Sequence, residues 1–378
     1  MAVTVSIKAP VNGAVLRWAR ESIGVALEKA AKKAAVAIDI YKKWEAGEDV
    51  PSIPRLRKLA NLFKRPLPIF FLPYIPQSPP LPKDFRKPAT ILKQPLSEAS
   101  LMAIRKARWY QSAARELMTD LGLPILSTSF PGLKSMPLEK IRENLQAPGI
   151  DMQKSWENNW TALKKWRSYL EDRGVFVFQF PIPVEEARGF SLVREDHPPV
   201  IAISSQDSPH GRIFTLFHEY CHILLEESGL CLPSETVETG LRDKEKFCDE
   251  FAGNFLVPAS QLVKSLKSSP GSKVEELIPG LSKEFLVSRF VILRRLYDLK
   301  EIDYRKYRKI FSELLKGVKK VEAGGGNFYK NQYAEKGKKF IGLVVEAESS
   351  GKITFSRALD YLAIKTKHYD HLLEMLYE

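Results

Sequence analysis

The chain has 378 residues, and because single hydrophobic cores stop growing near about 250–300 residues, we expect more than one domain. Its formal charge of +13 favours acidic partners such as double-stranded DNA, although it does not specify a fold. Three cysteines without CxxC spacing, and no stretch near the roughly 20 apolar residues that span a bilayer, argue against a disulfide-rich scaffold and a membrane protein and predict a cytoplasmic location.

The first 65 residues carry helical patterns throughout. Short helices are predicted from Leu16, over Leu27–Ala34, through Trp44 up to Gly47, and over Leu56–Phe63. Eight prolines then fall within residues 66–88, and because proline fixes φ and lacks a donor, this segment is predicted to be extended. It marks the clearest domain boundary.

The middle of the chain alternates helix and strand patterns. Helices are predicted near residues 97–123 and 160–172, the second closed by Gly174. Short apolar and aromatic runs then predict a small sheet, and Ser208-Pro209 is predicted to cap a helix that runs from about Arg212 to Glu227. The runs that predict strands are 175–180, 189–193 and 200–204.

The last third reads as helical. A helix is predicted over Lys244–Phe255, before Pro258, and others over about 282–317 and 333–376, with glycines 324–326 between them. The expected fold is α+β and mainly helical. The predicted domains are a helical head at 1–65, a proline-rich linker at 66–96, a central domain with the small sheet at 97–265, a helical domain at 266–322 and a helical tail at 323–378.

The segment His218 to His222 carries the chemistry. Residues four apart lie on one face of a helix, so His218 and His222 can present nitrogens to one tetrahedral Zn²⁺ ion. Glu219 lies about 100° around the same helix, where a general base can deprotonate the water that zinc activates. Apolar neighbours indicate that the helix is buried, and buried polar side chains need partners, which favours a metal site over incidental polarity.

A catalytic zinc needs a third protein ligand. Ser228 stands where a metzincin would have its third histidine, which excludes that class, and Glu226 lies about 12 Å along the axis from His218, too far to share an ion. The next helix offers Glu245 and Asp249, four apart on one face, so that one can bind zinc while the other orients a histidine. Glu250 is the competing candidate.

These two segments resemble the metallopeptidase family of ImmA and IrrE, in which a HExxH helix precedes a helix with the pattern ExxA/C-N-x-FA-x-x-L-x-P. The second pattern corresponds here to Glu245–Pro258, and the resemblance covers about residues 165–300. It implies a gluzincin-like zinc site with Glu245 as the third ligand. Asp249 stands where the family has asparagine, and we expect it to hydrogen-bond an imidazole N–H.

Two of the predicted strands are candidates for binding substrate. An edge strand above a zincin site can pair with an extended peptide, and residues 189–192 or 200–203 are able to supply it. The alternative is that both strands lie in the core.

Residues 16–71 resemble the helix-turn-helix of lambda-repressor-type (XRE-type) regulators, and the resemblance implies a recognition helix over Ala37–Glu45. Ile38 and Asp39 fall where Gln, Asn or Arg would read bases, and phosphates repel Asp39. The turn before the helix carries Ala35 rather than the usual glycine, and Ala37 replaces the usual Ser or Thr N-cap. Basic side chains are therefore the expected DNA contacts: Lys42, Lys43, Arg55 and Lys58.

The tail again has a pattern of two short helices about a turn and is expected to be an interaction module. His368 and His371 are a possible metal pair, but with no third partner nearby they are expected to be surface residues.

Two functions are the main candidates for these patterns, and a third is a hydrolase that acts on something other than a peptide, since a zinc hydroxide attacks several kinds of carbonyl. The first is a zinc-dependent endopeptidase acting in gene regulation on a protein substrate, and the family resemblance implies that this substrate is a repressor or an antitoxin. The second is a non-enzymatic DNA-binding regulator that uses the zincin core as a scaffold or metal sensor. The intact set of His218, Glu219 and His222 favours the enzyme. The sequence specifies neither the cleavage site nor the oligomeric state.

Overall fold

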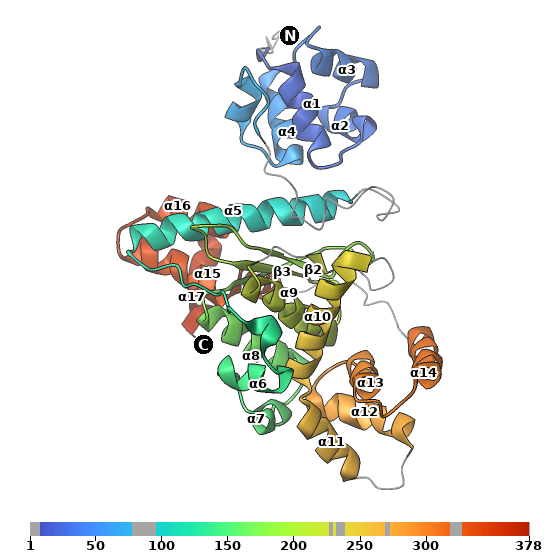
Figure 1. Ribbon diagram of the computed structural model, residues 1–378. Coiled ribbons are helices and arrows are strands. Elements are labelled where there is room, and N and C mark those ends of the chain that lie inside the picture. The colour runs from blue at the N-terminus through green and yellow to red at the C-terminus, as the bar shows by residue number, and fades with distance from the viewer. Residues whose placement is uncertain are drawn as a thin grey trace. The chain divides into compact units, whose positions relative to one another are not determined.

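The computed structural model describes residues 8–77, 96–226, 230–231, 239–268, 273–317 and 327–377 (Figure 1). They divide into two compact units. The head comprises residues 8–77 and 96–104, and the body comprises the described residues from 105 onward. None of the helices in these ranges has the length and apolar character needed to cross a membrane.

Four helices around a shared core build the head, as the sequence predicts. The start of α1 lies against the end of α3, where a Cβ on Gly13 would come within 2.5 Å of the Trp44 carbonyl oxygen, so this close approach requires glycine. Arg20 of α1 also holds Glu45 of α3 through two hydrogen bonds of 2.7 and 2.9 Å. The helices are α1 (Gly13–Glu21), α2 (Leu27–Ala34), α3 (Ile38–Ala46) and α4 (Ile53–Phe63).

The turn between α2 and α3 is made without its usual residues. Ala35 takes the left-handed conformation at φ 54°, which a glycine would adopt without strain. Ala37 occupies the N-cap of α3 and gives it no side-chain hydrogen bond. The turn geometry is therefore kept by the packing of the flanking helices rather than by local preference.

The prediction that residues 66–88 are extended is wrong at its start. Leu67–Phe71 forms a 3₁₀ helix, η1, with Pro66 at its N-cap and Pro68 in its first turn. Proline is tolerated there because the first N–H groups of a helix have no internal partner in any case. Residues 78–95 of the predicted linker lie outside the described residues.

A four-stranded sheet lies in the body, in the order β1-β3-β2-β4. β1 pairs with β3 in parallel, and β2 is antiparallel to both β3 and β4. The three strands predicted from the sequence are present, whereas the two-residue β4 was too short to predict. The strands are β1 (Phe176–Phe180), β2 (Gly189–Leu192), β3 (Val200–Ser204) and β4 (Leu230–Cys231).

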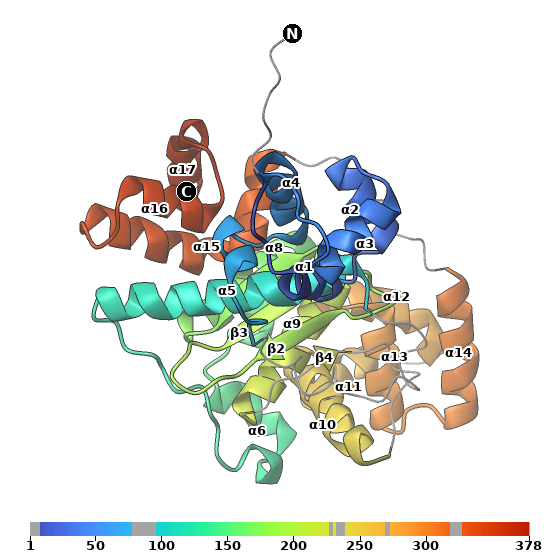
Figure 2. The same cartoon turned by 90° about the horizontal axis from the view of Figure 1, so that it is seen from above.

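The two faces of β1 meet different helices (Figures 1 and 2). Phe178 faces α5 (Glu98–Asp120) and α15 (Phe328–Ser349), since its ring stacks on Tyr110 at 4.9 Å and meets Phe340 at 5.8 Å. Val177, on the alternate face, belongs to the main core with the residues of α8 (Asn159–Asp172) and α9 (Pro209–Leu224). All five residues of β1 are buried, as expected of a strand covered on both sides.

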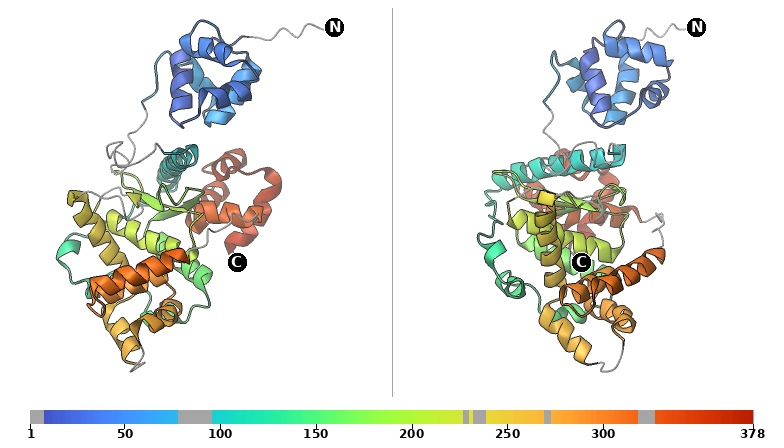
Figure 3. Two further views of the ribbon diagram at one scale, coloured as in Figure 1. Left: turned by 90° about the vertical axis from the view of Figure 1, so that its right-hand side faces the viewer. Right: turned by 45° about the vertical axis from the view of Figure 1, so that its right-hand side comes forward.

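Helices make up the remainder of the described body (Figure 3). Ser208 is the N-cap of α9, as predicted, but the helix runs from Pro209 to Leu224 rather than from about Arg212 to Glu227. The helix predicted at Lys244 begins earlier, at Thr239, and two helices, α11 and α12, begin before the region predicted to be helical from about residue 282. The elements are η3 (Leu133–Ser135), α6 (Leu138–Asn144), α7 (Ile150–Lys154), α10 (Thr239–Leu256), α11 (Ala259–Lys267), α12 (Val274–Phe285), α13 (Arg289–Asp298) and α14 (Tyr304–Lys316).

The tail packs on itself and on the sheet. α15 contacts β1, α16 (Phe355–Leu362) and α17 (Tyr369–Tyr377), and the short helix η4 (Thr366–His368) precedes α17. α15 is kinked at Gly337, whose φ of 82° is left-handed. Arg167 of α8 donates to the Ala334 carbonyl just before the kink, at 2.7 Å. The glycines expected to break the chain at 324–326 lie outside the described residues.

Candidate metal centre

Helix α9 carries three polar side chains through the core. Ser208 accepts a hydrogen bond from the Gly211 N–H at 3.1 Å, and Pro209 pre-sets the first turn, so the start of the helix is defined locally. His218, Glu219 and His222 are each no more than 2% exposed. Burial at this level requires partners for the imidazoles and the carboxylate.

The partners of the histidines come from α10, which packs along α9. Phe217 of α9 stacks on Phe255 of α10 with ring centroids 4.3 Å apart, and the edge of Trp166 from α8 contacts Phe217 at 4.8 Å. These rings lie on the apolar side of the helix pair. They set the distance and register of the two helices, and thereby bring Glu245 over the histidines.

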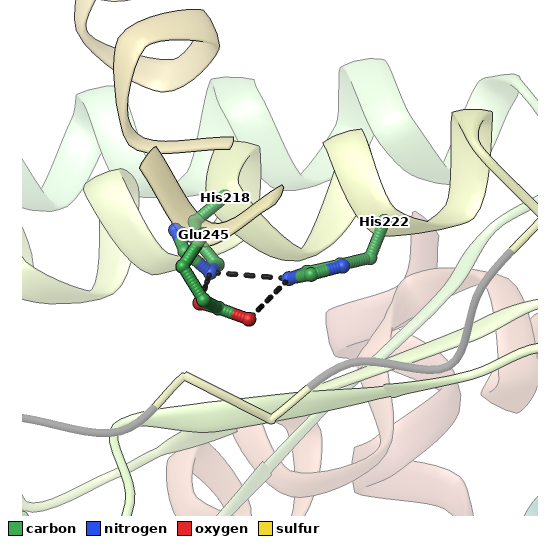
Figure 4. A group of neighbouring side chains, drawn as sticks. All are labelled: His218, His222 and Glu245. Carbon is green, nitrogen blue, oxygen red and sulfur yellow. Dashed lines mark hydrogen bonds and ion pairs between the residues drawn. The ribbon is translucent and has the colours of Figure 1, made fainter. Parts of the chain in front are cut away.

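Figure 4 shows His218, His222 and Glu245 pointing toward one another. The two Nε2 atoms are 3.3 Å apart, and the carboxylate oxygens of Glu245 lie 3.1 Å from Nε2 of His218 and 3.5 Å from Nε2 of His222. One ligand atom from each residue falls within 4.8 Å of the other two. Among the described residues, this is the group of three His, Cys, Asp or Glu side chains that converges in this way.

These separations can be compared with the requirements of a tetrahedral ion. Zn–N bonds of about 2.0–2.1 Å at the tetrahedral angle place two nitrogens about 3.3–3.4 Å apart, and a carboxylate oxygen at about 2.0–2.2 Å lies at a similar distance from each nitrogen. The observed separation of the two nitrogens, 3.3 Å, agrees with this value, and the two oxygens of Glu245 approach the nitrogens to similar distances, Oε2 to 3.1 Å from His218 and Oε1 to 3.5 Å from His222. Two imidazoles and one carboxylate are also the donor set of catalytic zinc sites that leave one position open. The residues present therefore fit a zinc ion.

Asp249, one turn after Glu245 on α10, contacts the other nitrogen of His218. Its Oδ1 lies 2.9 Å from Nδ1. A hydrogen bond from Nδ1–H to this carboxylate leaves the Nε2 lone pair directed at Glu245 and His222, which is the tautomer that a metal requires. The structure thus brings Asp249 to the position from which the sequence expected it to orient a histidine.

Glu219 is fully buried between the two histidines along α9. Its position on the helix is dictated by the 100° step from His218, so its side chain cannot share their direction toward Glu245. The Glu219 carboxylate therefore lies beside the ligand group rather than within it, a position that suits a general base rather than a metal ligand.

The C-terminal end of α10 is held by three polar side chains that sequence reasoning missed, of which Gln153 and Arg295 are buried and Arg142 is half-buried. Arg142 donates to the Phe255 carbonyl at 2.6 Å, Gln153 to the Leu256 carbonyl at 3.0 Å, and Arg295 to the Val257 carbonyl at 3.1 Å. These carbonyls have no partner within the helix. Arg142 and Gln153 lie on α6 and α7, whose short sequences carry no clear helical pattern, so nothing in the sequence pointed to them.

Two cysteines lie directly behind the ligands. Cys221 and Cys248 are buried, free thiols on α9 and α10. A hydrogen bond with Cys221, together with burial, holds the pKa of Cys248 well above its usual range. The Cys248 thiol therefore stays protonated at neutral pH.

The other candidates lie apart from the ligand group. Glu250, on the same helix as Glu245, pairs with Lys246 at 3.8 Å. Glu226 follows the end of α9 in the left-handed conformation, and the Ser228 used to exclude metzincins lies outside the described residues. In the tail, His368 accepts or donates a hydrogen bond with Tyr329 at 2.9 Å, and it forms no metal group with His371 among the described residues.

The proposed edge strands need correction. β3 lies inside the sheet between β1 and β2, and β2 pairs with β4 through Gly189 and Phe190. β3 is therefore a core strand, as the alternative interpretation held. Its backbone N–H and C=O groups pair with strands on both sides, which leaves none for a peptide. Among the strands described, the outer positions belong to β1 and β4.

In the head, Lys42 and Lys43 are exposed on α3, and Arg55 and Lys58 are exposed on α4. Lys42 lies 3.9 Å from Asp39. Lys42 and Lys43 thus lie on the expected recognition helix and Arg55 and Lys58 on the helix that follows it, all four with their charges in solvent.

The body and the head match two different known families. Residues 170–297 match the family model of the IrrE N-terminal-like domain, a metallopeptidase family, and residues 16–70 match the helix-turn-helix family. The first match contains α9, α10 and all three candidate ligands, and the second contains α2, the turn and α3. No curated protein matches the chain.

Proposed function

Because the chain joins a domain of the IrrE N-terminal-like family to a helix-turn-helix domain, we propose that it is a zinc-dependent endopeptidase that acts in gene regulation. The observation that carries the proposal is the convergence of His218, His222 and Glu245, with their ligand atoms within 4.8 Å of one another, beside the buried Glu219.

In this mechanism, His218, His222 and Glu245 hold the ion, and Asp249 keeps His218 in the tautomer that presents Nε2. Zinc, when bound, supplies Lewis acidity to the peptide carbonyl and to the attacking water. A carboxylate oxygen of Glu219 accepts the proton of that water and returns it to the amide nitrogen of the departing segment. The apolar surroundings of α9 strengthen each of these electrostatic interactions by excluding bulk water.

The head supports the substrate class that the family resemblance implies. The head carries 13 basic and 6 acidic side chains over residues 8–77, a net formal charge of +7 that suits a polyanion such as double-stranded DNA. A protease with a DNA-binding head encounters proteins that occupy the same DNA. We therefore include in the proposal that its substrate is a repressor or an antitoxin.

Zinc content and cleavage together test the proposal. The purified full chain should bind about one zinc ion, and His218→Ala and Glu245→Ala should lose it. Glu250→Ala is the matched control on α10, because Glu250 lies outside the ligand group and its removal should leave the zinc content unchanged. Zinc retained at full stoichiometry by His218→Ala would contradict the site.

Cleavage is measured on peptides prepared from a bacterial proteome, with new N-termini identified by mass spectrometry. The zinc-loaded chain should generate a defined set of cuts, and Glu219→Gln should keep the metal but lower the rate by about 10²–10⁴-fold. Glu226→Gln, which removes an exposed carboxylate just beyond α9, should cut normally. A Glu219→Gln variant that cleaves at the wild-type rate would refute the assigned role of Glu219, and a wild-type chain that binds zinc without cutting would favour the non-enzymatic regulator.

A further inference from the structure

Helix α14 lies at the outer edge of the body and packs on α13 through its apolar side (Figures 1 and 3). Tyr307 contacts Tyr297 of α13 with ring centroids 5.0 Å apart, and Phe311 contacts Phe290 of the same helix at 5.4 Å. Ile310, between these two aromatic residues, is buried. The apolar side of this amphipathic helix is therefore already covered, and the opposite side faces solvent.

The exposed side of α14 carries a row of cationic side chains. The helix contains five basic residues and one acidic residue, Glu313. At 100° per residue, four of the basic side chains fall within about 100° of arc, and at 1.5 Å per residue the row is about 16 Å long. All four are exposed. We call these four residues the basic stripe: Arg305, Arg308, Lys309 and Lys316.

The charges of the basic stripe are not neutralised by neighbouring carboxylates. The fifth basic residue, Lys306, lies beside the stripe and pairs with Glu275 at 3.0 Å, whereas the ion pairs and side-chain hydrogen bonds found between described residues include no side chain of the stripe. Arg308 and Lys309 follow Arg305 by three and four residues, a spacing at which like charges repel each other and destabilise a helix. Helix stability therefore does not account for the stripe, and a surface that serves solubility alone mixes both signs of charge.

Among anionic partners, duplex DNA suits this surface best. A helix that binds a membrane surface inserts its apolar side, but the apolar side of α14 is turned toward α13. Protein interfaces are centred on buried apolar and aromatic side chains, with few lysines. The phosphate backbone instead presents a continuous array of negative charge, and basic residues along one side of a helix are typical of proteins that bind it. The same chain also contains a domain of the helix-turn-helix family.

We propose that the basic stripe of α14 binds the phosphate backbone of duplex DNA without preference for sequence, as a DNA contact of the body that is separate from the head. The contact goes beyond the proposed function, which assigns DNA to the head alone. Two linked contacts on one duplex bind more tightly than either alone, because the second forms within the complex. The peptidase body is thereby held on the DNA rather than only tethered to a head that binds it.

Fluorescence anisotropy of the full chain on a duplex of mixed sequence, over a range of NaCl concentrations, tests this contact. Each phosphate contact contributes about 0.9 to the slope of log affinity against log salt. Replacing the whole basic stripe by alanine should therefore lower the slope by about 3–4 and weaken binding at about 0.1 M salt by at least tenfold. Because alanine favours a helix, α14 should still form, and an unchanged circular dichroism spectrum verifies this.

The matched control removes the same number of exposed positive charges from the tail. It should leave the slope unchanged, because the tail is not part of the proposed contact. Equal losses of affinity and slope in the two variants would show that net charge alone attracts DNA, and would overturn the proposal. The control lysines, each replaced by alanine, are Lys338, Lys352, Lys365 and Lys367.

The Lys42→Ala, Lys43→Ala variant separates the body from the head. Replacing the basic stripe in this variant should lower the slope by the same amount as in the wild type, because the two surfaces contact different phosphates. A loss that occurs only with the stripe would refute the contacts of the head and support those of α14. A stripe variant with the affinity and slope of the wild type would overturn the proposal whatever the head does.

Two other anionic probes test the choice of partner. Polyglutamate represents an acidic protein segment, and vesicles of phosphatidylcholine and phosphatidylserine represent an anionic membrane. Both should bind the full chain more weakly than duplex DNA at the same salt concentration. Tighter binding to either probe that is lost on replacing the basic stripe would overturn the proposal and assign α14 to that partner.

Discussion

The body and the head use polar side chains in opposite ways. In the body, His218, Glu219 and His222 are withdrawn from solvent and fixed by neighbouring helices, whereas Lys42 and Lys43 of the head extend into solvent. Buried groups are costly and must be satisfied, so their geometry is specific and suits chemistry. Exposed charges are mobile and weakly directed, so they suit attraction to a polyanion, and specificity must come from a few projecting side chains.

A buried polar group need not belong to a functional site. Lys336 is a buried charge outside the candidate metal centre, and its cost in stability is the largest effect that we expect. Lys336 on α15 is 1% exposed, and burial lowers its pKa to about 8 from the usual 10.5. Because the folded-state pKa is the lower one, the unfolded chain binds more protons between about pH 8 and 10.5. The free energy of unfolding should rise with pH across this window, and below pH 8 the full cost of the buried charge remains.

Lys336→Met should therefore raise the free energy of unfolding of the body at pH 7 by up to about 3 kcal/mol, and the gain should shrink toward pH 10. Chemical denaturation at both pH values measures it. Lys338→Met removes an exposed charge two residues away and should show no such pH-dependent gain. An equal gain at pH 7 and pH 10 would show that the charge of Lys336 is not the cause.

The second prediction tests whether the contact between Asp249 and His218 contributes to zinc binding. Asp249→Ala removes the acceptor for Nδ1 of His218 and should weaken zinc binding about 10–100-fold without eliminating it. Asp249→Asn retains an acceptor oxygen and should recover much of the affinity. Competition with a zinc chelator gives the dissociation constants, and equal affinity in wild type and Asp249→Ala would place Asp249 outside the site.

The salt dependence of DNA binding tests whether Lys42 and Lys43 of the head contact phosphates. Each phosphate contact contributes about 0.9 to the slope of log affinity against log salt, so Lys42→Ala with Lys43→Ala should reduce the slope by nearly 2. Fluorescence anisotropy on a fixed duplex at several salt concentrations measures this. Lys352→Ala with Lys365→Ala, which removes two exposed charges from the tail, is the control and should keep the slope.

The smallest effect concerns the turn of the head. Ala35→Gly should stabilise the head by about 1 kcal/mol, because glycine adopts the left-handed conformation at φ 54° without the penalty that alanine bears. Hydrogen exchange of the α2 and α3 amides in the full chain reports this locally. Ala46→Gly, at a right-handed position of α3, should instead destabilise the helix, and a gain there would contradict the backbone argument.

Much of the molecule followed from local patterns. The four head helices, the three longer strands and the start of α9 were predicted because apolar periodicity, Ser208-Pro209 and β-branched runs act over short stretches. The chemistry of His218 to His222 was also local, since helical spacing alone brings both imidazoles to one face. Short elements such as α7 and β4 escaped prediction because five or two residues hold too little pattern.

The tertiary structure decided everything that depends on distance through space. On spacing alone, Glu245, Asp249 and Glu250 were alternatives on one helix, and the family resemblance favoured Glu245 without placing it. The packing of Phe217 on Phe255 turns Glu245 toward both histidines and Asp249 toward Nδ1 of His218. Likewise, the donors at the end of α10 come from α6, α7 and α13, and such long-range contacts leave no periodic trace in a sequence. The residue types that this chemistry needs are thus local properties of the chain, whereas their convergence depends on how apolar faces far apart in the chain pack together.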